Sequence, residues 1–196
     1  MPSLPSIPGR NASVGGNAST SGHNASSSGI TFEETRKTLI AINQSLFEET
    51  KQSLLETNQS LLNSIVDLNY EAYDFLCSDD MSCIEPETNR NVVSGKEFHK
   101  YYFDVFGSIK KDGEEGETGM MAKTAAATAT TTKVTMVMPH VQIMCEGNAA
   151  VISYVKLTQQ TSSGKPPVTI QESETRVWEK RDSKWVNIHF HKSDKS

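Results

Sequence analysis

Two histidines lie two residues apart near the end of the sequence, in the segment WVNIHFHKS. Imidazoles at this spacing can bind a metal ion, act as acid–base catalysts, or simply share one face of a strand. Because side chains alternate across a strand, Trp185, His189 and His191 are expected together on one face. That face is amphipathic and suits a protein–protein interface. The opposite face is apolar and ends in Lys192, which suits a face covered by helices.

A zinc site built on His189 and His191 needs at least one more ligand. The other candidates, His140 and the cysteines, lie on separate segments, and no spacing brings them together. We therefore predict no metal site and assign both histidines to an interface. The sequence shows no Gly-x-Ser-x-Gly motif and no phosphate-binding loop. It predicts neither a catalytic residue nor a cofactor.

Three cations lie on three predicted strands: Lys156, Arg176 and Lys192. The direction of Arg176 depends on the turn at RDSK. A two-residue loop pairs Arg176 with His189 and turns it away from Lys192, whereas a three-residue loop places both cations on the cavity face. Buried cations are rare unless they are paired, so three of them in a cavity would predict an anionic group there. The alternative is three cations on the surface.

Composition limits the class of protein. The chain has 196 residues and a net charge of −5 at pH 7, which argues against nucleic acid or an anionic membrane surface as a partner. No apolar run approaches the ~20 residues that span a bilayer. We expect a reducing, cytoplasmic setting, because the 3 cysteines are scattered and no signal peptide pattern is visible.

The chain begins with a tail and a helical extension. Residues 1–30 are rich in Ser, Gly and Asn, so we predict a disordered tail. A capping box at Thr31 and Glu34 predicts the start of a long helix. That helix is either unbroken or broken near Thr50. Residues 31–50 form an extension that projects beyond the core or packs on a partner chain.

The globular part, residues 48–193, begins with helices and ends with strands. A short helix, two short strands and an amphipathic helix (SGKEFHKYYFDVF) are followed by an acidic, Ala/Thr-rich segment at 110–133, which we predict as a flexible loop. Four strands in two hairpins come next. This order indicates an α+β fold in which helices pack on one face of a curved sheet and enclose a cavity.

Many segments of this part resemble, in order, the association or hub domain of calcium/calmodulin-dependent protein kinase II: KQSLLETNQSLL, YEAYDFLC, IEPE, GKEFHKYYFD, PHVQIM, SYVKLTQ, ESETRVWEKRDSKW and HFHKS. The resemblance implies a nuclear transport factor 2-like cone, with a long N-terminal helix and short helices on a strongly curved antiparallel sheet. It implies a homo-oligomer, a two-layered ring of roughly 12 to 20 subunits built from dimers. Hub-bearing kinase subunits are a further implied partner.

The resemblance also implies a basic cavity that takes small carboxylates. Arg176 of ETRVW keeps the family residue, whereas Lys156 and Lys192 stand where the family usually has arginine. His99 and Tyr102 of FHKYYF match a His and a Tyr of the pocket. Placing Arg176 in this cavity favours the three-residue turn. Lysine keeps the charge but lacks the bidentate fork of arginine.

The sequence also departs from the family pattern. Gly107 stands where the family has a tryptophan beside the pocket, and the loop at 110–133 is longer than usual. Kinase motifs and a calmodulin-binding helix are missing, so the chain resembles a stand-alone hub or a fragment of a kinase. The alternative function is an isomerase- or cyclase-type enzyme of the same fold. Its acid–base candidates are Glu85, His99 and Tyr102.

Overall fold

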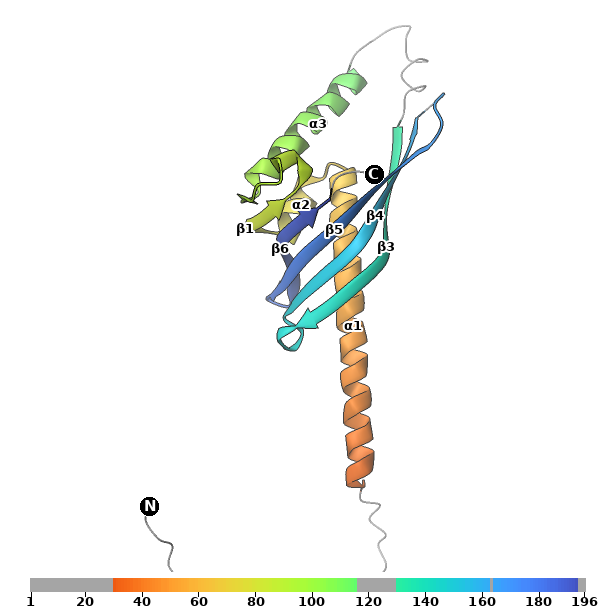
Figure 1. Cartoon of the computed structure of the whole chain (residues 1–196), viewed down its shortest axis with the longest axis vertical. Helices are drawn as coiled ribbons and strands as arrows, with labels where there is room; N and C mark the ends of the chain where they lie inside the picture. Colours follow the sequence, from red (N-terminus) through yellow and green to blue (C-terminus); the bar gives the residue numbers. More distant parts are fainter. Residues whose placement is uncertain (1–29, 116–129, 163, 194–196) are drawn as a thin grey trace, which may run out of the picture. The chain divides into compact units, whose positions relative to one another are not determined.

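The computed structural model describes residues 30–115, 130–162 and 164–193 (Figure 1). The chain divides into two units, Met1–Thr38 and Leu39–Ser196. The predicted tail lies outside the described residues, apart from Ile30. No helix in the described part is long and apolar enough to cross a membrane.

The first helix, α1 (Phe32–Val66), runs without a break past Thr50. It starts at the predicted capping box. The Glu34 carboxylate accepts the Thr31 backbone N–H at 2.8 Å, and the Thr31 hydroxyl accepts the Glu34 N–H at 3.2 Å. Of the two alternatives for this segment, the unbroken helix is correct, since no Gly or Pro interrupts the hydrogen-bond ladder.

Two further helices follow, α2 (Tyr70–Leu76) and α3 (Glu97–Glu115). Asn69 caps α2, because its side chain accepts the backbone N–H of Ala72. Single 3₁₀ turns, η1 and η3, span Pro86–Thr88 and Cys145–Gly147. The limits of the predicted 110–133 loop are wrong at both ends, because α3 continues to Glu115 and a strand begins at Thr130. Residues 116–129 lie outside the described residues.

Six strands form one sheet in the order β2-β1-β6-β5-β4-β3 (Figure 1). Their bounds are β1 Cys77–Ile84, β2 Val93–Ser94, β3 Thr130–Met144, β4 Ala149–Ser162, β5 Val168–Arg181 and β6 Lys184–Lys192. All neighbouring strands pair antiparallel except β1 and β6, which are parallel. The predicted α+β architecture is confirmed, with one parallel pair in a sheet expected to be antiparallel.

One face of the sheet, here called the inner face, packs on the helices. Side chains alternate along β4 and β5, so every second residue is buried on this face at 150–154 and at 172–178. Leu54 and Leu61 of α1 are fully buried in the same core as Ile152 and Trp178. The opposite, outer face carries side chains that are only partly buried, among them Val151, Val155 and Val177.

The β5–β6 hairpin corrects the predicted turn. Arg181 pairs with Lys184, so the loop has two residues, Asp182 and Ser183. Both have positive φ, 49° and 65°, as a type I′ turn requires. A β-bulge then leaves Ile188 unpaired, because Val177 pairs with His189 while Trp178 pairs with Asn187.

The bulge decides which side chains reach the core. It places Arg176 opposite Phe190, the partner expected from a three-residue turn, although the turn has two residues. It also reverses the side-chain direction of the residues before it. Trp185 is therefore buried in the core at 4% exposure, and its predicted place on the outer face is wrong. His189 and His191, beyond the bulge, do lie on the outer face, half-buried and exposed respectively.

Candidate functional site

A cavity of about 360 Å³ opens between the inner face, the end of α1, α2 and α3. Its volume lies within the range of small-ligand sites. All six residues predicted for the cavity line it: Glu85, His99, Tyr102, Lys156, Arg176 and Lys192. Its apolar wall, which the sequence did not reveal, consists of Ile65, Phe103, Phe106 and Phe190. Gly107 lies in α3 close to this wall in sequence, and a side chain there would enter open space.

Arg176 is the most enclosed of the three cations, at 2% exposure. Its Nε donates to the Tyr154 hydroxyl at 3.0 Å, and its terminal nitrogens donate to Glu174 at 3.1 Å and Asn187 at 3.2 Å. The guanidinium also lies 4.0 Å from the centre of the Phe190 ring. These four contacts hold the guanidinium in place within the core.

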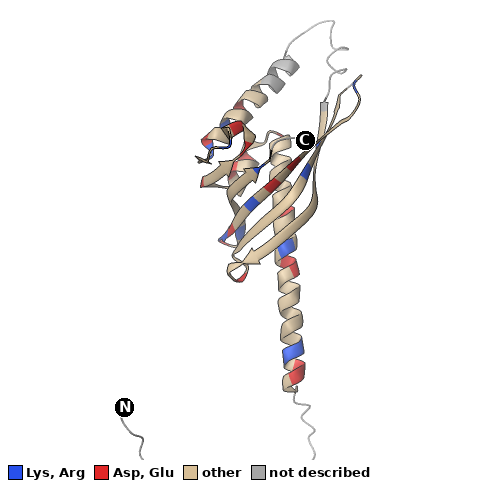
Figure 2. Cartoon of the chain, viewed as in Figure 1, with Lys and Arg blue, Asp and Glu red and all other residues tan. Residues whose placement is uncertain are grey.

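Lys156 completes this buried network. Its ammonium lies 2.6 Å from a Glu174 oxygen and 2.8 Å from a Glu172 oxygen. Burial alone would raise the pKa of Glu174, but the charges of Arg176 and Lys156 lower it to about 2. Glu174 is therefore ionised at neutral pH and holds two cations. Figure 2 shows acidic and basic residues side by side on these strands.

Lys192 belongs to a second group, nearer the cavity mouth. Its ammonium lies 3.2 Å from Glu85 and 2.9 Å from Glu87. Burial alone would lower the pKa of Lys192, but these carboxylates raise it above its usual value. Glu87 is the least enclosed carboxylate of the cavity, with 31% of its side chain exposed. Of the carboxylates that pair with these cations, Glu87 is therefore the one most open to solvent.

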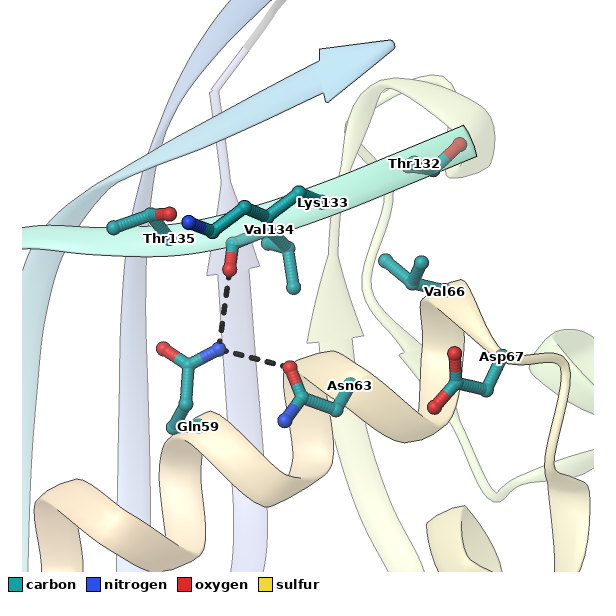
Figure 3. Close-up of a pocket in the computed structure, with 8 residues that line it drawn as sticks. All are labelled: Gln59, Asn63, Val66, Asp67, Thr132, Lys133, Val134 and Thr135. Atoms are coloured by element: carbon teal, nitrogen blue, oxygen red, sulfur yellow. Dashed lines mark hydrogen bonds between the residues drawn. The ribbon is translucent and has the colours of Figure 1, made fainter. Parts of the chain in front are cut away.

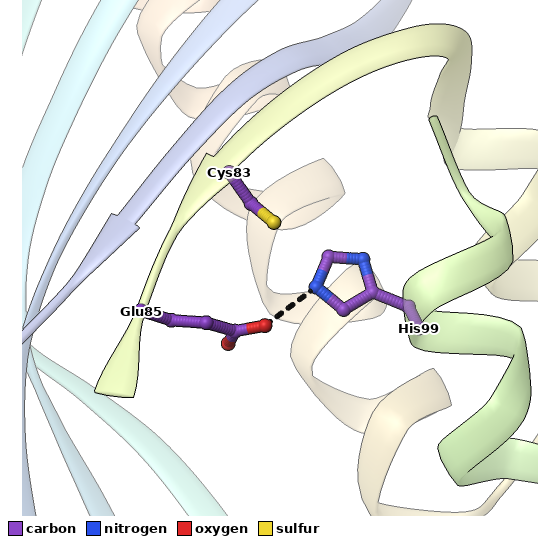
Figure 4. A group of neighbouring side chains, drawn as sticks. All are labelled: Cys83, Glu85 and His99. Carbon is purple, nitrogen blue, oxygen red and sulfur yellow. Dashed lines mark hydrogen bonds and ion pairs between the residues drawn. The ribbon is translucent and has the colours of Figure 1, made fainter. Parts of the chain in front are cut away.

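His99 connects the second group to the core (Figure 4). Its Nε2 lies 2.9 Å from a Glu85 oxygen, and its Nδ1 lies 2.7 Å from the Tyr73 hydroxyl. Burial alone would raise the pKa of Glu85, but His99 and Lys192 lower it below its usual value. The Cys83 sulfur lies in the same place, and Cys83, Glu85 and His99 have ligand atoms within 4.8 Å of one another. Burial raises the pKa of the Cys83 thiol to about 11.

Three carboxylates that sequence reasoning missed are Glu87, Glu172 and Glu174. Together with Glu85, which was predicted, they pair with the three cations. The anionic group expected beside the cations is thus supplied by the protein itself. A signal was present, because Glu172, Glu174 and Arg176 are two residues apart on one strand and must share a face.

A second hollow, of about 470 Å³, lies between α1 and β3 (Figure 3). Gln59 donates there to the Val134 carbonyl at 3.3 Å and to the Asn63 side chain at 3.0 Å. These bonds tie the helix to the strand. The hollow lacks the convergent charged groups of the first cavity, so we do not assign a site to it.

A long helix and short helices on a curled sheet define a nuclear transport factor 2-like fold. A solved NTF2-like protein from Cytophaga hutchinsonii shares this fold, with a TM-score of 0.50 and 17% identity over 73% of this chain and 96% of that one. The sequence matches the family "Calcium/calmodulin dependent protein kinase II association domain" over residues 50–124 and 110–196. The chain belongs to this family, as the segment resemblance predicted.

Two relatives show the extent of the match. The solved hub homology domain from Chlamydomonas reinhardtii is 37% identical, with a TM-score of 0.57 over 73% of this chain and 96% of that chain. The delta subunit of calcium/calmodulin-dependent protein kinase type II from Oryctolagus cuniculus is 35% identical over 125 residues. That match spans 64% of this chain but only 20% of the kinase subunit. The shared part is the association domain, and the chain is an association module.

Proposed function

We propose that this chain assembles into a closed ring of hub domains through the outer face of its sheet. The observation that supports this is the row of partly buried apolar side chains on that face, Val151, Val155 and Val177, flanked by His189 and His191. Apolar surface of this kind gains free energy when a second copy covers it. Trp185 is not part of the proposed contact, because its side chain is in the core.

The ring would place many copies of any attached segment close together, which raises their effective concentration. Kinase subunits that carry the same association domain are the proposed partners, because they would offer the same surface. We also propose a cytoplasmic setting, since Cys77, Cys83 and Cys145 are all free thiols. We propose no catalytic role.

The interface can be tested with charge substitutions. Replacing His189 and His191 together with Asp should reduce the native mass measured by mass photometry, because two repelling carboxylates would be buried against a second copy. Lys165→Asp, in the exposed β4–β5 turn, is the control and should leave the mass unchanged. An unchanged mass in the double variant would show that the interface lies on another face.

We also propose that the cavity takes a small carboxylate, with Lys192 as its anchor. The ligand carboxylate would replace Glu87, the most exposed partner of Lys192, while Glu85 keeps its place. Its apolar part would lie against Phe103 and Phe106. Arg176 and Lys156 would support the site without binding the ligand, because their carboxylate partners Glu172 and Glu174 are buried, whereas Glu87 is 31% exposed.

Calorimetric titration with hydroxybutyrate tests this arrangement. Lys192→Gln should weaken binding by about tenfold or more, since it removes the charge-assisted bond. Lys133→Gln, an exposed lysine on β3, is the matched control. Equal affinity in the Lys192 variant and the wild type would refute the role of Lys192, and a wild type that does not bind would refute the carboxylate site.

A further inference from the structure

Three metal-ligating side chains converge at the wall of the cavity, where two of them, Glu85 and His99, line it. Cys83 and Glu85 are two residues apart on extended backbone, so both side chains point to the same side. His99, on α3, faces them from the opposite wall (Figure 4). The sulfur, a carboxylate oxygen and a ring nitrogen lie within 4.8 Å of one another. Two segments distant in sequence, the end of β1 and the start of α3, thus bring three different ligand types to one point.

We propose that Cys83, Glu85 and His99 bind a divalent transition-metal ion, with zinc as the best match. Zinc accepts sulfur, nitrogen and oxygen ligands together, whereas magnesium and calcium require oxygen-rich sites. Three protein ligands leave a fourth position free, and here it would face the cavity. This arrangement goes beyond ring assembly and does not depend on it.

The surroundings of His99 already suit a metal ligand. The Tyr73 hydroxyl lies 3.6 Å from the Met81 sulfur, to which it donates, so its oxygen can accept the Nδ1–H of His99. This bond fixes the plane of the ring, and a metal ion would take the place of the proton that Nε2 shares with Glu85. Metal-binding histidines usually have such a partner on the second nitrogen. Tyr73 is 3% exposed and holds its position through the core.

The charges of the cavity also favour a cation. Four carboxylates face three cations, so the carboxylates outnumber the cations around this point. Lys192 opposes the ion, but its contact is with Glu85 Oε2, and Oε1 is the oxygen that faces His99. The two oxygens can therefore serve Lys192 and the metal separately.

Cobalt titration of the full chain tests the proposal, because a thiolate bound to Co²⁺ gives a near-ultraviolet charge-transfer band that oxygen and nitrogen ligands do not. The wild type, freed of metal with a chelator, should develop this band with one Co²⁺ per chain and lose it when Zn²⁺ is added. Cys83→Ser should abolish the band, and Glu85→Gln should weaken binding by about tenfold or more. Cys145→Ser, which removes the exposed thiol, is the control and should keep the band.

Two outcomes would overturn the site: no band in the wild type, or a band that survives Cys83→Ser. X-ray absorption of the zinc-loaded wild type provides a second measurement that does not depend on any variant folding. It should show one sulfur among lighter ligands, and a shell without sulfur would refute the proposal. Mass photometry of the same samples distinguishes the metal site from ring assembly, because the oligomer mass does not depend on whether metal binds.

Discussion

Strand β5 carries two Glu-x-Arg pairs that differ only in their surroundings. Glu174 and Arg176 are 1% and 2% exposed on the inner face, with 3.1 Å between oxygen and nitrogen. Glu179 and Arg181, five residues later, are 44% and 47% exposed, with a shorter distance of 2.8 Å. The shorter pair is nevertheless expected to contribute less, because water screens both of its charges.

The difference shows what burial does to one sequence pattern. In the buried pair, each group depends on the other, since neither can exchange its partner for water. In the exposed pair, Arg181 also donates to the Ser78 hydroxyl at 2.7 Å and can turn to solvent. The same Glu-x-Arg motif therefore forms a buried ion pair on which the core depends at one position and a solvent-exposed ion pair at the other.

The largest effect is expected from breaking the buried pair. Glu174→Gln should lower the free energy of unfolding by about 3 to 5 kcal/mol, because it leaves two buried cations without their shared carboxylate. Glu179→Gln, the matched change in the exposed pair, should cost less than about 1 kcal/mol. Urea unfolding at one fixed protein concentration measures both. Equal losses would show that burial does not separate the two pairs.

Low pH should also weaken the buried pair, because it protonates Glu174. The pKa of Glu174 falls from 4.5 to about 2 on folding, so the folded state binds this proton less readily than the unfolded chain does. The stability from Glu174 is then complete above pH ~4.5 and is lost as the pH falls towards 2, on the order of 3 kcal/mol. Between pH 6 and 3, the free energy of unfolding should fall less steeply with pH in Glu174→Gln than in the wild type. Identical slopes would contradict the lowered pKa.

A smaller loss of stability is expected when the side chain of Asn187, which accepts a hydrogen bond from Arg176, is removed. Asn187 is fully buried, accepts from Arg176 and donates to the carbonyls of Val177 and His189 at 2.9 Å. Asn187→Ala should cost about 1 to 3 kcal/mol, because buried donors and acceptors lose their partner. The measurement is again urea unfolding, with Asn148→Ala beside the β3–β4 turn as control. If the free energy of unfolding falls no more than in the control, the contact of Arg176 with Asn187 on β6 does not contribute to stability.

These contacts also mark where sequence reasoning succeeds. Motif order predicted the family, and the cavity residues from Glu85 to Lys192 do line one cavity. The capping box of Thr31 and Glu34 is local, so sequence alone located it. The capping box rests on information within a few residues, whereas the cavity residues were brought together by the resemblance to the family.

Long-range pairing was beyond such reasoning. Strict alternation placed Trp185 outside, but one unpaired residue, Ile188, moves the side chains before it to the opposite face of the sheet. A bulge depends on what the neighbouring strand can pack, so no local signal announces it. The approach of Cys83 to His99 likewise depends on how α3 folds back on β1. The partners of Lys156, Glu172 and Glu174, could have been predicted from the alternation of side chains along β5, because they share a face with Arg176.

The central claim, that this chain is an association module, is tested most directly by its native mass over a range of dilutions. Native mass spectrometry or mass photometry should give a mass of roughly a dozen or more 21.6 kDa subunits that persists on dilution. A protein that remains a dimer or a monomer at every concentration would contradict the account.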